Sequence, residues 1–293
     1  QQSRGGSVDI LIVVDNSVSM IDEQIKVGQR FGDFVSALND VDWQIGFTTT
    51  DAREQYNSDR FGGRLLYLHD SNQRILNRHT LDLQHLFLKT INRERDQIFC
   101  DGSDAFPCGS NLEEPLKVTM QASDRRHQEN SGFFRQDAAL AVLILSDEDE
   151  GSTGPSSATS ASQVISKVRS VFGANKKFTT YGIVIQPGDT ACFEQNRNDG
   201  GEYGDFVQQL AQATGGFTGS LCDSDYSKTL RAISQSVRKI LMVSEVLLEH
   251  PPVAGSLKVQ FSPAINAVKW QLKRQKVIFA EPPTEDTRID VIY

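Results

Sequence analysis

The sequence predicts a doubly wound α/β domain with a mostly parallel sheet, followed by a small all-β module. Apolar runs at residues 8–14, 138–145 and 178–185 have the continuous hydrophobicity of strands buried on both faces. Segments with apolar residues at helical spacing lie between these runs, and strands that alternate with helices favour a parallel sheet. Residues 243–293 instead alternate apolar and polar side chains between prolines, which is typical of short antiparallel strands.

The elements expected in the first half follow from these periodicities. Ser19, with Asp22 three residues later, is similar to a capping box and predicts that a helix starts after the first strand. Apolar residues at helical spacing continue this helix to Leu38. The further elements are a strand at 43–50, a short hairpin strand at 65–68 and a helix at 81–91.

The second half repeats the alternation. After the strand at 138–145 we expect helices at 164–172, 206–213 and 230–241, and strands at 178–185 and 217–221. In the last part, strands are expected around 257–261, 268–272 and 289–293. The predicted division is an N-terminal extension at 1–7, an α/β domain at 8–242 and a β-module at 243–293.

Composition and charge exclude several classes of protein. No apolar run approaches the ~18–20 residues of a membrane span, so no transmembrane segment is expected. A net charge of −8 argues against nucleic-acid binding through phosphate neutralisation. The chain begins at Gln1 without a secretory signal, which we interpret as a mature or trimmed start that leaves room for a lipid anchor upstream.

The four cysteines lack the spacing and the neighbouring histidines of a zinc site. Local pairing gives disulfides Cys100–Cys108 and Cys192–Cys222, although four cysteines allow three connectivities. Disulfides predict an oxidising, exported location: the cell surface, the periplasm or the medium. The alternative is a cytosolic protein with four unpaired thiols.

The loop after the first strand carries oxygen side chains at alternate positions: Asp15, Ser17 and Ser19. Such hard ligands suit a small divalent cation such as Mg²⁺. The alternative is an ordinary Asp/Ser turn at the start of a helix. Two more strands end in similar loops, at 49–51 and 147–149, and the carboxyl ends of parallel strands form the ligand-binding edge of a doubly wound sheet.

The first and third loops resemble the metal-ion-dependent adhesion site (MIDAS) of von Willebrand factor A (VWA) and integrin inserted domains. The resemblance rests on residues 13–20, Val-Val-Asp-Asn-Ser-Val-Ser-Met, and on 143–147, Leu-Ile-Leu-Ser-Asp. It implies that Asp15, Ser17 and Ser19 are metal ligands, and that Asp147 binds directly or through water. Residues 133–138, 146–149, 215–216 and 222–223 are also similar to a bacterial branch of secreted or lipid-anchored VWA proteins.

The second loop departs from the family pattern, which supplies a Thr before a helix. Here the corresponding residues are 108–116, Cys-Gly-Ser-Asn-Leu-Glu-Glu-Pro-Leu. Ser110 is the nearest chemical substitute, and Glu113 is the alternative ligand. A carboxylate at this place would make the cation less attractive to an acidic partner. Asp51, Glu148 and Asp149 are interpreted either as residues that orient the ligands or line the rim, or as solvated surface.

The function implied is metal-dependent adhesion. A Mg²⁺ ion, or Mn²⁺ or Ca²⁺ in its place, would coordinate an acidic group offered by a protein or glycan partner. One alternative is a structural exported protein whose cation only stabilises the loops. The other is a Mg²⁺-dependent hydrolase, but the sequence has no P-loop, no Gly-x-Ser-x-Gly and no His beside the acidic loops. We therefore expect a binding protein rather than an enzyme.

Overall fold

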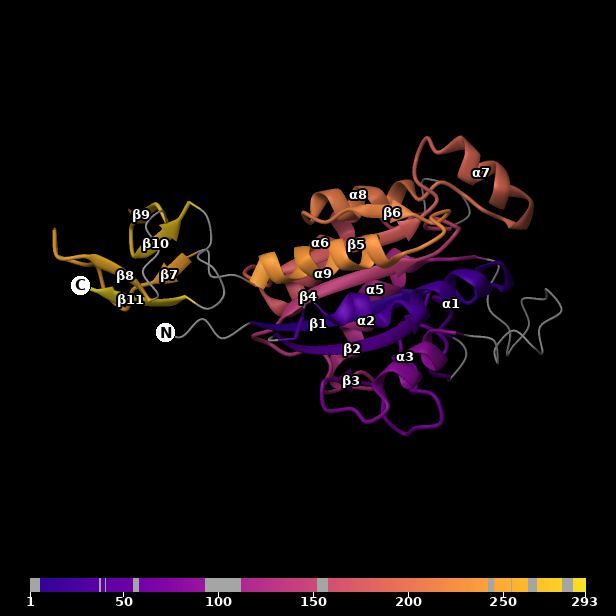
Figure 1. Cartoon of the computed structure of the whole chain (residues 1–293), viewed down its shortest axis with the longest axis horizontal. Helices are drawn as coiled ribbons and strands as arrows, with labels where there is room; N and C mark the ends of the chain where they lie inside the picture. The colour runs from indigo at the N-terminus through magenta and orange to yellow at the C-terminus, as the bar shows by residue number, and fades with distance from the viewer. Residues whose placement is uncertain are drawn as a thin grey trace.

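The structure is a computed structural model of the 293-residue chain. It describes residues 6–36, 38–39, 41–54, 58–92, 112–151, 158–241, 245–253, 255–262, 268–280 and 287–293. A six-stranded sheet between two layers of helices makes up the larger part, and a group of short strands lies beyond one end of it (Figure 1). Within the described residues, no helix combines the length and hydrophobicity that crossing a membrane requires.

The main sheet has the strand order β3-β2-β1-β4-β5-β6. All neighbouring strands in it are parallel except β2 and β3. The order reverses at β1, which pairs with β2 on one side and with β4 on the other, so the carboxyl ends of β1 and β4 form the switch point where such sheets bind ligands. The strands are β1 (Ser7–Val14), β2 (Asp42–Thr49), β3 (Leu76–Asn77), β4 (Ala139–Leu145), β5 (Phe178–Val184) and β6 (Thr218–Ser220). The predicted fold class is confirmed.

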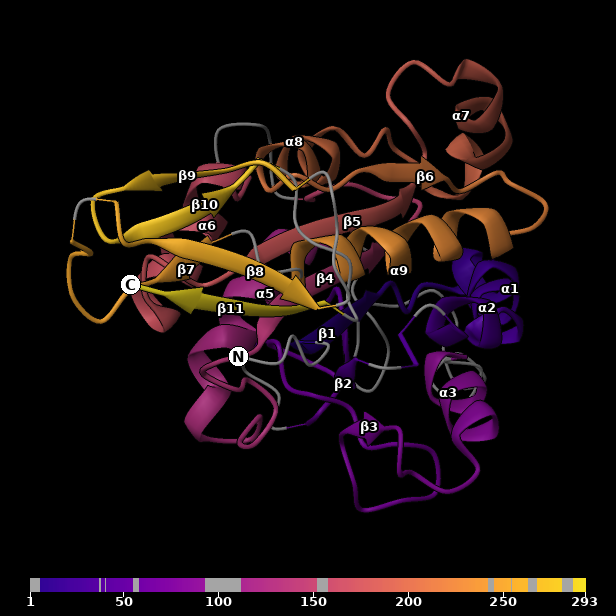
Figure 2. The same ribbon diagram turned by 60° about the vertical axis from the view of Figure 1, so that its left-hand side comes forward.

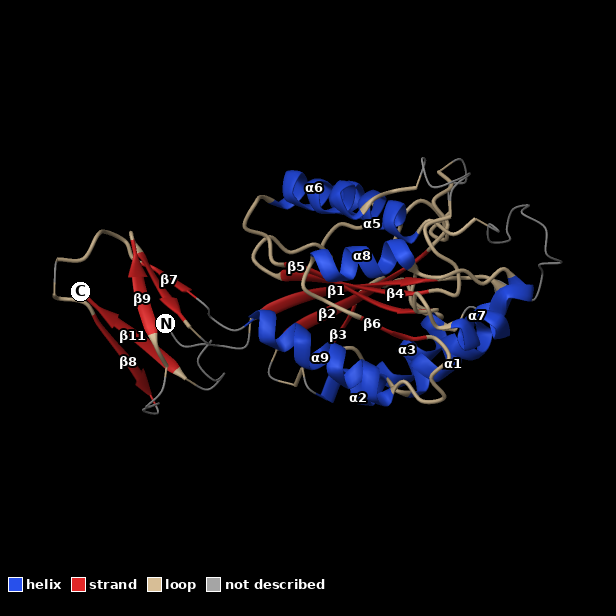
Figure 3. Cartoon of the chain, turned by 90° about the horizontal axis from the view of Figure 1, so that it is seen from above, coloured by secondary structure: helices blue, strands red, loops and turns tan. Residues whose placement is uncertain are grey.

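Helices cover both faces of this sheet, as the continuous hydrophobicity of its central strands requires (Figure 3). Along β1, Ile10 and Ile12 contribute to one core and Leu11 and Val13 to the other, because successive side chains point to opposite faces. The first core is closed by α1 (Ile21–Gln29), α2 (Phe31–Ser36), α3 (Leu83–Ile91) and α9 (Ser227–Leu241). The second is closed by α5 (Pro115–Asp124), α6 (Ala161–Phe172) and α8 (Asp205–Ala213).

Three local expectations were wrong. Ser19 does not cap a helix: the chain passes through a 3₁₀ turn, η1 (Val18–Met20), and α1 then starts without a side-chain cap. The helix expected to run to Leu38 is interrupted at Arg30, which separates α1 from α2. Residues 65–68 form no strand, and β2 pairs instead with the two residues of β3.

The short helix α7 (Thr190–Asn196) was not expected; it precedes the 3₁₀ turn η3 (Arg197–Asp199), and a similar turn, η2 (Arg125–His127), follows α5. Cys192 of α7 forms a disulfide with Cys222, which confirms that predicted pairing. This bond fixes α7 to the segment after β6. The predicted Cys100–Cys108 pair lies outside the described residues.

The C-terminal strands form two antiparallel sheets, as the period-two pattern predicts (Figure 2). They enclose a small core of their own, formed by Leu248, Val277, Phe279 and Ile289. Two of the strands, β7 and β10, were not expected. The three-stranded sheet is β7 (Glu245–Leu247), β10 (Lys276–Phe279) and β9 (Trp270–Lys273), and the two-stranded sheet is β8 (Lys258–Ser262) and β11 (Arg288–Ile292).

A buried ion pair ties together the amino-terminal ends of the central strands. The carboxylate of Asp9, in β1, is fully buried and accepts hydrogen bonds from the backbone N–H and from Nε of Arg135, each at 2.7 Å. The same guanidinium donates to the carboxylate of Asp42, at the start of β2, and to the carbonyl of Val8. Burial raises the pKa of Asp9, and the positive charge of Arg135 opposes that rise.

We expect Arg135→Ala to lower the free energy of unfolding by roughly 2–3 kcal/mol, because it leaves the Asp9 carboxylate buried without its counter-charge. Urea denaturation measures the change. The double variant Asp9→Asn/Arg135→Met, which removes both charges, should recover part of the loss. An Arg135→Ala protein as stable as the original would contradict this role for the pair.

Candidate metal centre

Asp15 lies at the centre of the candidate site, directly after β1. Its buried carboxylate accepts a hydrogen bond from the backbone N–H of Ser17 at 2.8 Å and from the hydroxyl of Ser146 at 2.6 Å. Its own backbone N–H donates to the carbonyl of Leu145 at 2.9 Å, so the ends of β1 and β4 are joined. The buried amide of Gln24 donates to the Asp15 carbonyl at 2.7 Å. The carboxylate is therefore held at the switch point of the sheet.

The two serines of the first loop lie together beside Asp15. The hydroxyl oxygens of Ser17 and Ser19 are 2.8 Å apart. Ser17 is the extended residue before the 3₁₀ turn η1, and Ser19 is inside that turn. The Ser19 hydroxyl therefore lies beside that of Ser17 in the loop and does not cap a helix.

The loop before α5 contributes Glu113, which is fully buried. The hydroxyl of Thr50, at the end of β2, donates to Oε2 of Glu113, and the N–H of Glu114 donates to the Thr50 carbonyl at 3.0 Å. Oε1 of Glu113 has no hydrogen-bond partner among the described residues. Of the two alternatives for the second loop, Glu113 is therefore at the site, whereas Ser110 lies outside the described residues.

Asp147 follows β4 and is buried, and neither of its carboxylate oxygens has a hydrogen-bond partner in the described part of the chain. A buried carboxylate without partners is costly, because it has lost its hydration without replacement. Oε1 of Glu113 and Oδ1 of Asn16, which directly follows Asp15, likewise lack hydrogen-bond partners among the described residues.

The carboxyl groups also repel one another. Burial raises the pKa of Asp147 to about 8, and the charge of Asp15 adds to the rise. Burial, followed by the charges of Asp15 and Asp147, raises the pKa of Glu148 to about 8. The pKa of Glu113 is raised well above its ordinary value by burial and then by Asp15. Such a cluster is stabilised by protons or by a cation.

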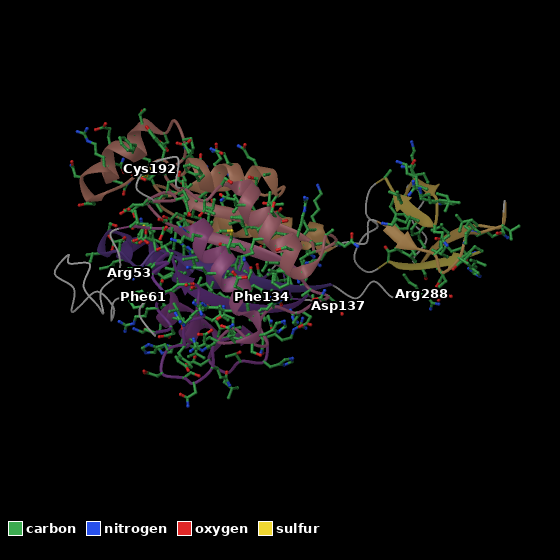
Figure 4. The ribbon with its side chains drawn as sticks, turned by 180° about the vertical axis from the view of Figure 1, so that it is seen from behind. Arg53, Phe61, Phe134, Asp137, Cys192 and Arg288 are labelled. Carbon is green, nitrogen blue, oxygen red and sulfur yellow. A yellow bond between two sulfur atoms is a disulfide. The ribbon has the colours of Figure 1, made fainter. Side chains whose placement is uncertain are left out.

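The remaining acidic residues have protein partners. The buried carboxylate of Asp51 pairs with Arg53 at 2.6 Å, and Arg53 in turn lies over the ring of Phe61 (Figure 4). Asp149 accepts from the N–H groups of Phe206 and Val207 in the first turn of α8, at 2.9 and 3.3 Å. It therefore binds the unpaired amides of a helix start, a role that the sequence did not reveal.

Glu150 and Ser146 were not recognised in the sequence as contributors to this end, whereas Thr50 belongs to the loop at 49–51 that the sequence singled out. Glu150 accepts from the N–H groups of Leu116 and Lys117, and so binds the start of α5 as Asp149 binds that of α8. Ser146 and Thr50 hold Asp15 and Glu113. The available signal for Ser146 was its position immediately after the predicted strand at 138–145.

The donor set suits a hard cation. Carboxylate and hydroxyl oxygens, without sulfur or imidazole, favour Mg²⁺, Mn²⁺ or Ca²⁺ over softer metals. No group of three or more His, Cys, Asp or Glu side chains able to hold a metal ion occurs within the described ranges. The arrangement differs from such a cage because serine hydroxyls lie beside the carboxylates, and buried oxygens of Asp147 and Glu113 have no partner among the described residues, which is compatible with a cation.

Neither the known protein families nor the curated proteins contain a match to this sequence. Among solved structures, the pilus adhesin SpaC from Lactobacillus rhamnosus GG, in an open conformation, is similar at 12% identity and a TM-score of 0.45. That alignment covers 100% of this chain but 39% of SpaC, so the chain spans about two fifths of its length.

Two further structures are similar at the same level. Proximal thread matrix protein 1 from the mussel byssus, in a form with a zinc-occupied MIDAS motif, has 13% identity and a TM-score of 0.40, covering 83% of this chain and 50% of that one. The conserved hypothetical protein BatB from Bacteroides thetaiotaomicron has 12% identity and a TM-score of 0.41, covering 80% and 98%. What these proteins bind is a property of those proteins.

We expect the metal-free protein to be less stable at pH 8 than at pH 5. The folded carboxyls, such as Asp147 with a pKa of about 8, bind protons more tightly than they do in the unfolded chain, where the value is near 4. The folded state therefore holds more protons between these values, and stability falls as the pH rises through that window. Urea denaturation of chelator-treated protein at both pH values measures the difference.

Asp147→Asn is the matched variant for this experiment. It removes one of the repelling charges, so its stability should fall less between pH 5 and pH 8 than that of the original protein. Equal pH dependence in the two proteins would show that the Asp147 carboxylate does not contribute to the loss of stability between pH 5 and pH 8.

Proposed function

We propose that this chain is a metal-dependent binding module of the VWA type. Asp15, Ser17, Ser19 and Asp147 would hold a divalent cation, Mg²⁺ or else Mn²⁺ or Ca²⁺, at the carboxyl ends of β1 and β4. The observation that carries the proposal is the set of buried carboxylate oxygens of Asp147 and Glu113 without partners among the described residues. They lie in the same acidic cluster as Asp15, which two hydrogen bonds already orient.

When bound, the cation supplies a positive charge and a coordination position that an external carboxylate can fill. The chain's own residues determine how much of that charge remains. Asp15 and Asp147 balance a divalent ion, whereas an ionised Glu113 would make the site net negative. The Thr50 hydroxyl binds one oxygen of Glu113, and burial raises the pKa of Glu113 in the metal-free protein. A bound cation would lower that pKa again. The cation would remain attractive to an acidic group only with Glu113 in its neutral form.

The partner would be a protein or a glycan that offers a carboxylate, and the role is binding rather than catalysis. The Cys192–Cys222 disulfide supports an exported location, at the cell surface, in the periplasm or in the medium. We further propose a domain boundary near residue 242, because the C-terminal sheets have their own core. Attachment through a lipid upstream of residue 1 belongs to the same proposal.

A structural cation is the second candidate. Its support is that Asp147 and Glu113 are almost fully buried, so a cation would relieve their repulsion even without any partner. The two candidates share the metal site and differ in whether an external carboxylate reaches the ion. Two measurements, taken in order, separate them.

Calorimetric titration of Mg²⁺ and Mn²⁺ into chelator-treated protein should show saturable binding at one site. Asp15→Ala should abolish this binding, because it removes the carboxylate at the centre of the ligand set. Asp22→Ala is the matched control: it deletes an exposed carboxylate of α1, seven residues away in sequence, and should leave the affinity unchanged. Absence of binding in folded original protein would rule out both candidates.

Water-proton relaxation of the Mn²⁺-loaded protein then tests for an open coordination position. For a binding module, adding a short Glu-containing peptide should lower the relaxation rate, because its carboxylate displaces a water from the ion. The same peptide with Gln in place of Glu should have no effect. If neither peptide changes the relaxation rate, the cation is structural.

A further inference from the structure

Strand β9 of the C-terminal module has an apolar face that its own module does not cover. Trp270 and Leu272 stand opposite Phe279 and Val277 of β10, and opposite residues of an antiparallel pair point to the same side of the sheet. Val277 and Phe279 are 0% and 4% exposed, as core residues are. Trp270 and Leu272 on the same side are nevertheless 37% and 41% exposed.

The reason is that the two sheets of the module differ in width. The ring of Phe261, in β8, packs against that of Phe279 with centroids 5.9 Å apart, so the two-stranded sheet covers β10. The opposing sheet has three strands, and β9 is at its margin (Figure 2). The core-facing side chains of β9, Trp270 and Leu272, are exposed accordingly.

The backbone of β9 is also open on one edge. Within the described residues it pairs with β10 alone. The N–H of Ala280 donates to the Lys269 carbonyl at 2.8 Å, and hydrogen-bonded pairs alternate along such a ladder. The N–H and C=O groups of Trp270 and Leu272 therefore point away from β10, toward the free edge. An added strand would find both hydrogen-bonding groups and an apolar surface there.

The opposite face of the hairpin is basic. Lys273 and Lys276 stand opposite each other, and Lys269 shares their side of the sheet, two residues from Gln271. Residues 268–280 contain four Lys or Arg and no acidic residue, in a chain whose net charge is −8. A strand beside β9 would therefore meet lysines on one face and Trp270 and Leu272 on the other.

We propose that the free edge of β9 binds an extended segment of a partner protein in which apolar and acidic residues alternate. The segment would add a strand to the sheet: its apolar side chains would cover Trp270 and Leu272, and its carboxylates would face the lysines. A second copy of this chain is a poorer occupant, because two β9 strands side by side would bring their lysines together. Lysines alone would serve to keep an edge unpaired. They do not account for exposed Trp and Leu on the core-facing side.

Fluorescence anisotropy with the full chain tests the proposal. The probe is a labelled, end-blocked decapeptide in which Glu alternates with Val or Thr. We expect saturable binding that a chelator leaves unchanged, since β9 is independent of the metal centre. A peptide of the same composition with its Glu residues in one block should bind at least about tenfold more weakly, because it cannot present one acidic and one apolar face.

Charge reversal is the decisive variant. Lys269→Glu/Lys273→Glu should weaken binding of the probe about tenfold or more and should create binding of a decapeptide in which Lys replaces Glu. This exchange of preference also shows that the variant is folded. Lys258→Glu/Arg288→Glu, at exposed positions of β8 and β11, is the matched control and should bind the probe as the original does.

Leu272→Pro removes an N–H that points to the free edge, and should reduce binding of both peptides. Four results would overturn the proposal. They are no saturable binding of the probe, equal binding of the blocked peptide, unchanged binding after charge reversal, and sedimentation of the free chain as a dimer that Lys269→Glu/Lys273→Glu dissociates. A fifth result would also overturn it: binding of the full chain to anionic vesicles, but not to the peptide, would assign the surface to a membrane.

Discussion

The burial of several carboxylates at one end of the sheet is the constraint on which the rest of the structure depends. Removing a carboxylate from water is unfavourable unless hydrogen bonds or counter-charges replace its hydration. Asp15 receives the Ser17 amide and the Ser146 hydroxyl, and Asp149 receives two amides of α8. The loops are therefore shaped by where backbone N–H groups can reach these oxygens.

This constraint also positions the helices. Consecutive residues of the loop after β4 bind different elements: Asp149 binds the start of α8 and Glu150 binds the start of α5. The first turn of a helix offers unpaired N–H groups and a partial positive charge, so each contact satisfies both the carboxylate and the helix. Asp147, two residues earlier, lacks such a partner among the described residues. Within this loop, Asp149 and Glu150 therefore stabilise the fold, whereas Asp147 is available for a ligand.

The elements that sequence predicted well are those whose signal is local. The strand runs at 8–14 and 178–185 and the oxygen positions in the first loop depend on neighbouring residues, and the structure has strands and a loop there. The partners of Asp15 and Glu113 could not be deduced, because Ser146 lies 131 residues from Asp15 and Thr50 lies 63 residues from Glu113. Ser19 was misinterpreted for a related reason: a Ser followed by an acidic residue fits a helix cap as well as it fits a hydroxyl ligand.

The metal centre and the edge of β9 differ in how they would attract an acidic partner. At the carboxyl ends of β1 and β4, several buried carboxyl groups lie close together, so an external carboxylate would be attracted there only when a cation is bound. At β9, positive charge is present without any ion, together with a backbone edge that no other described strand pairs with. An acidic segment would need no cation to bind at β9. Two acidic surfaces of one partner could therefore bind in different ways. Binding at the metal centre would depend on the divalent cation, and binding at β9 would depend on ionic strength.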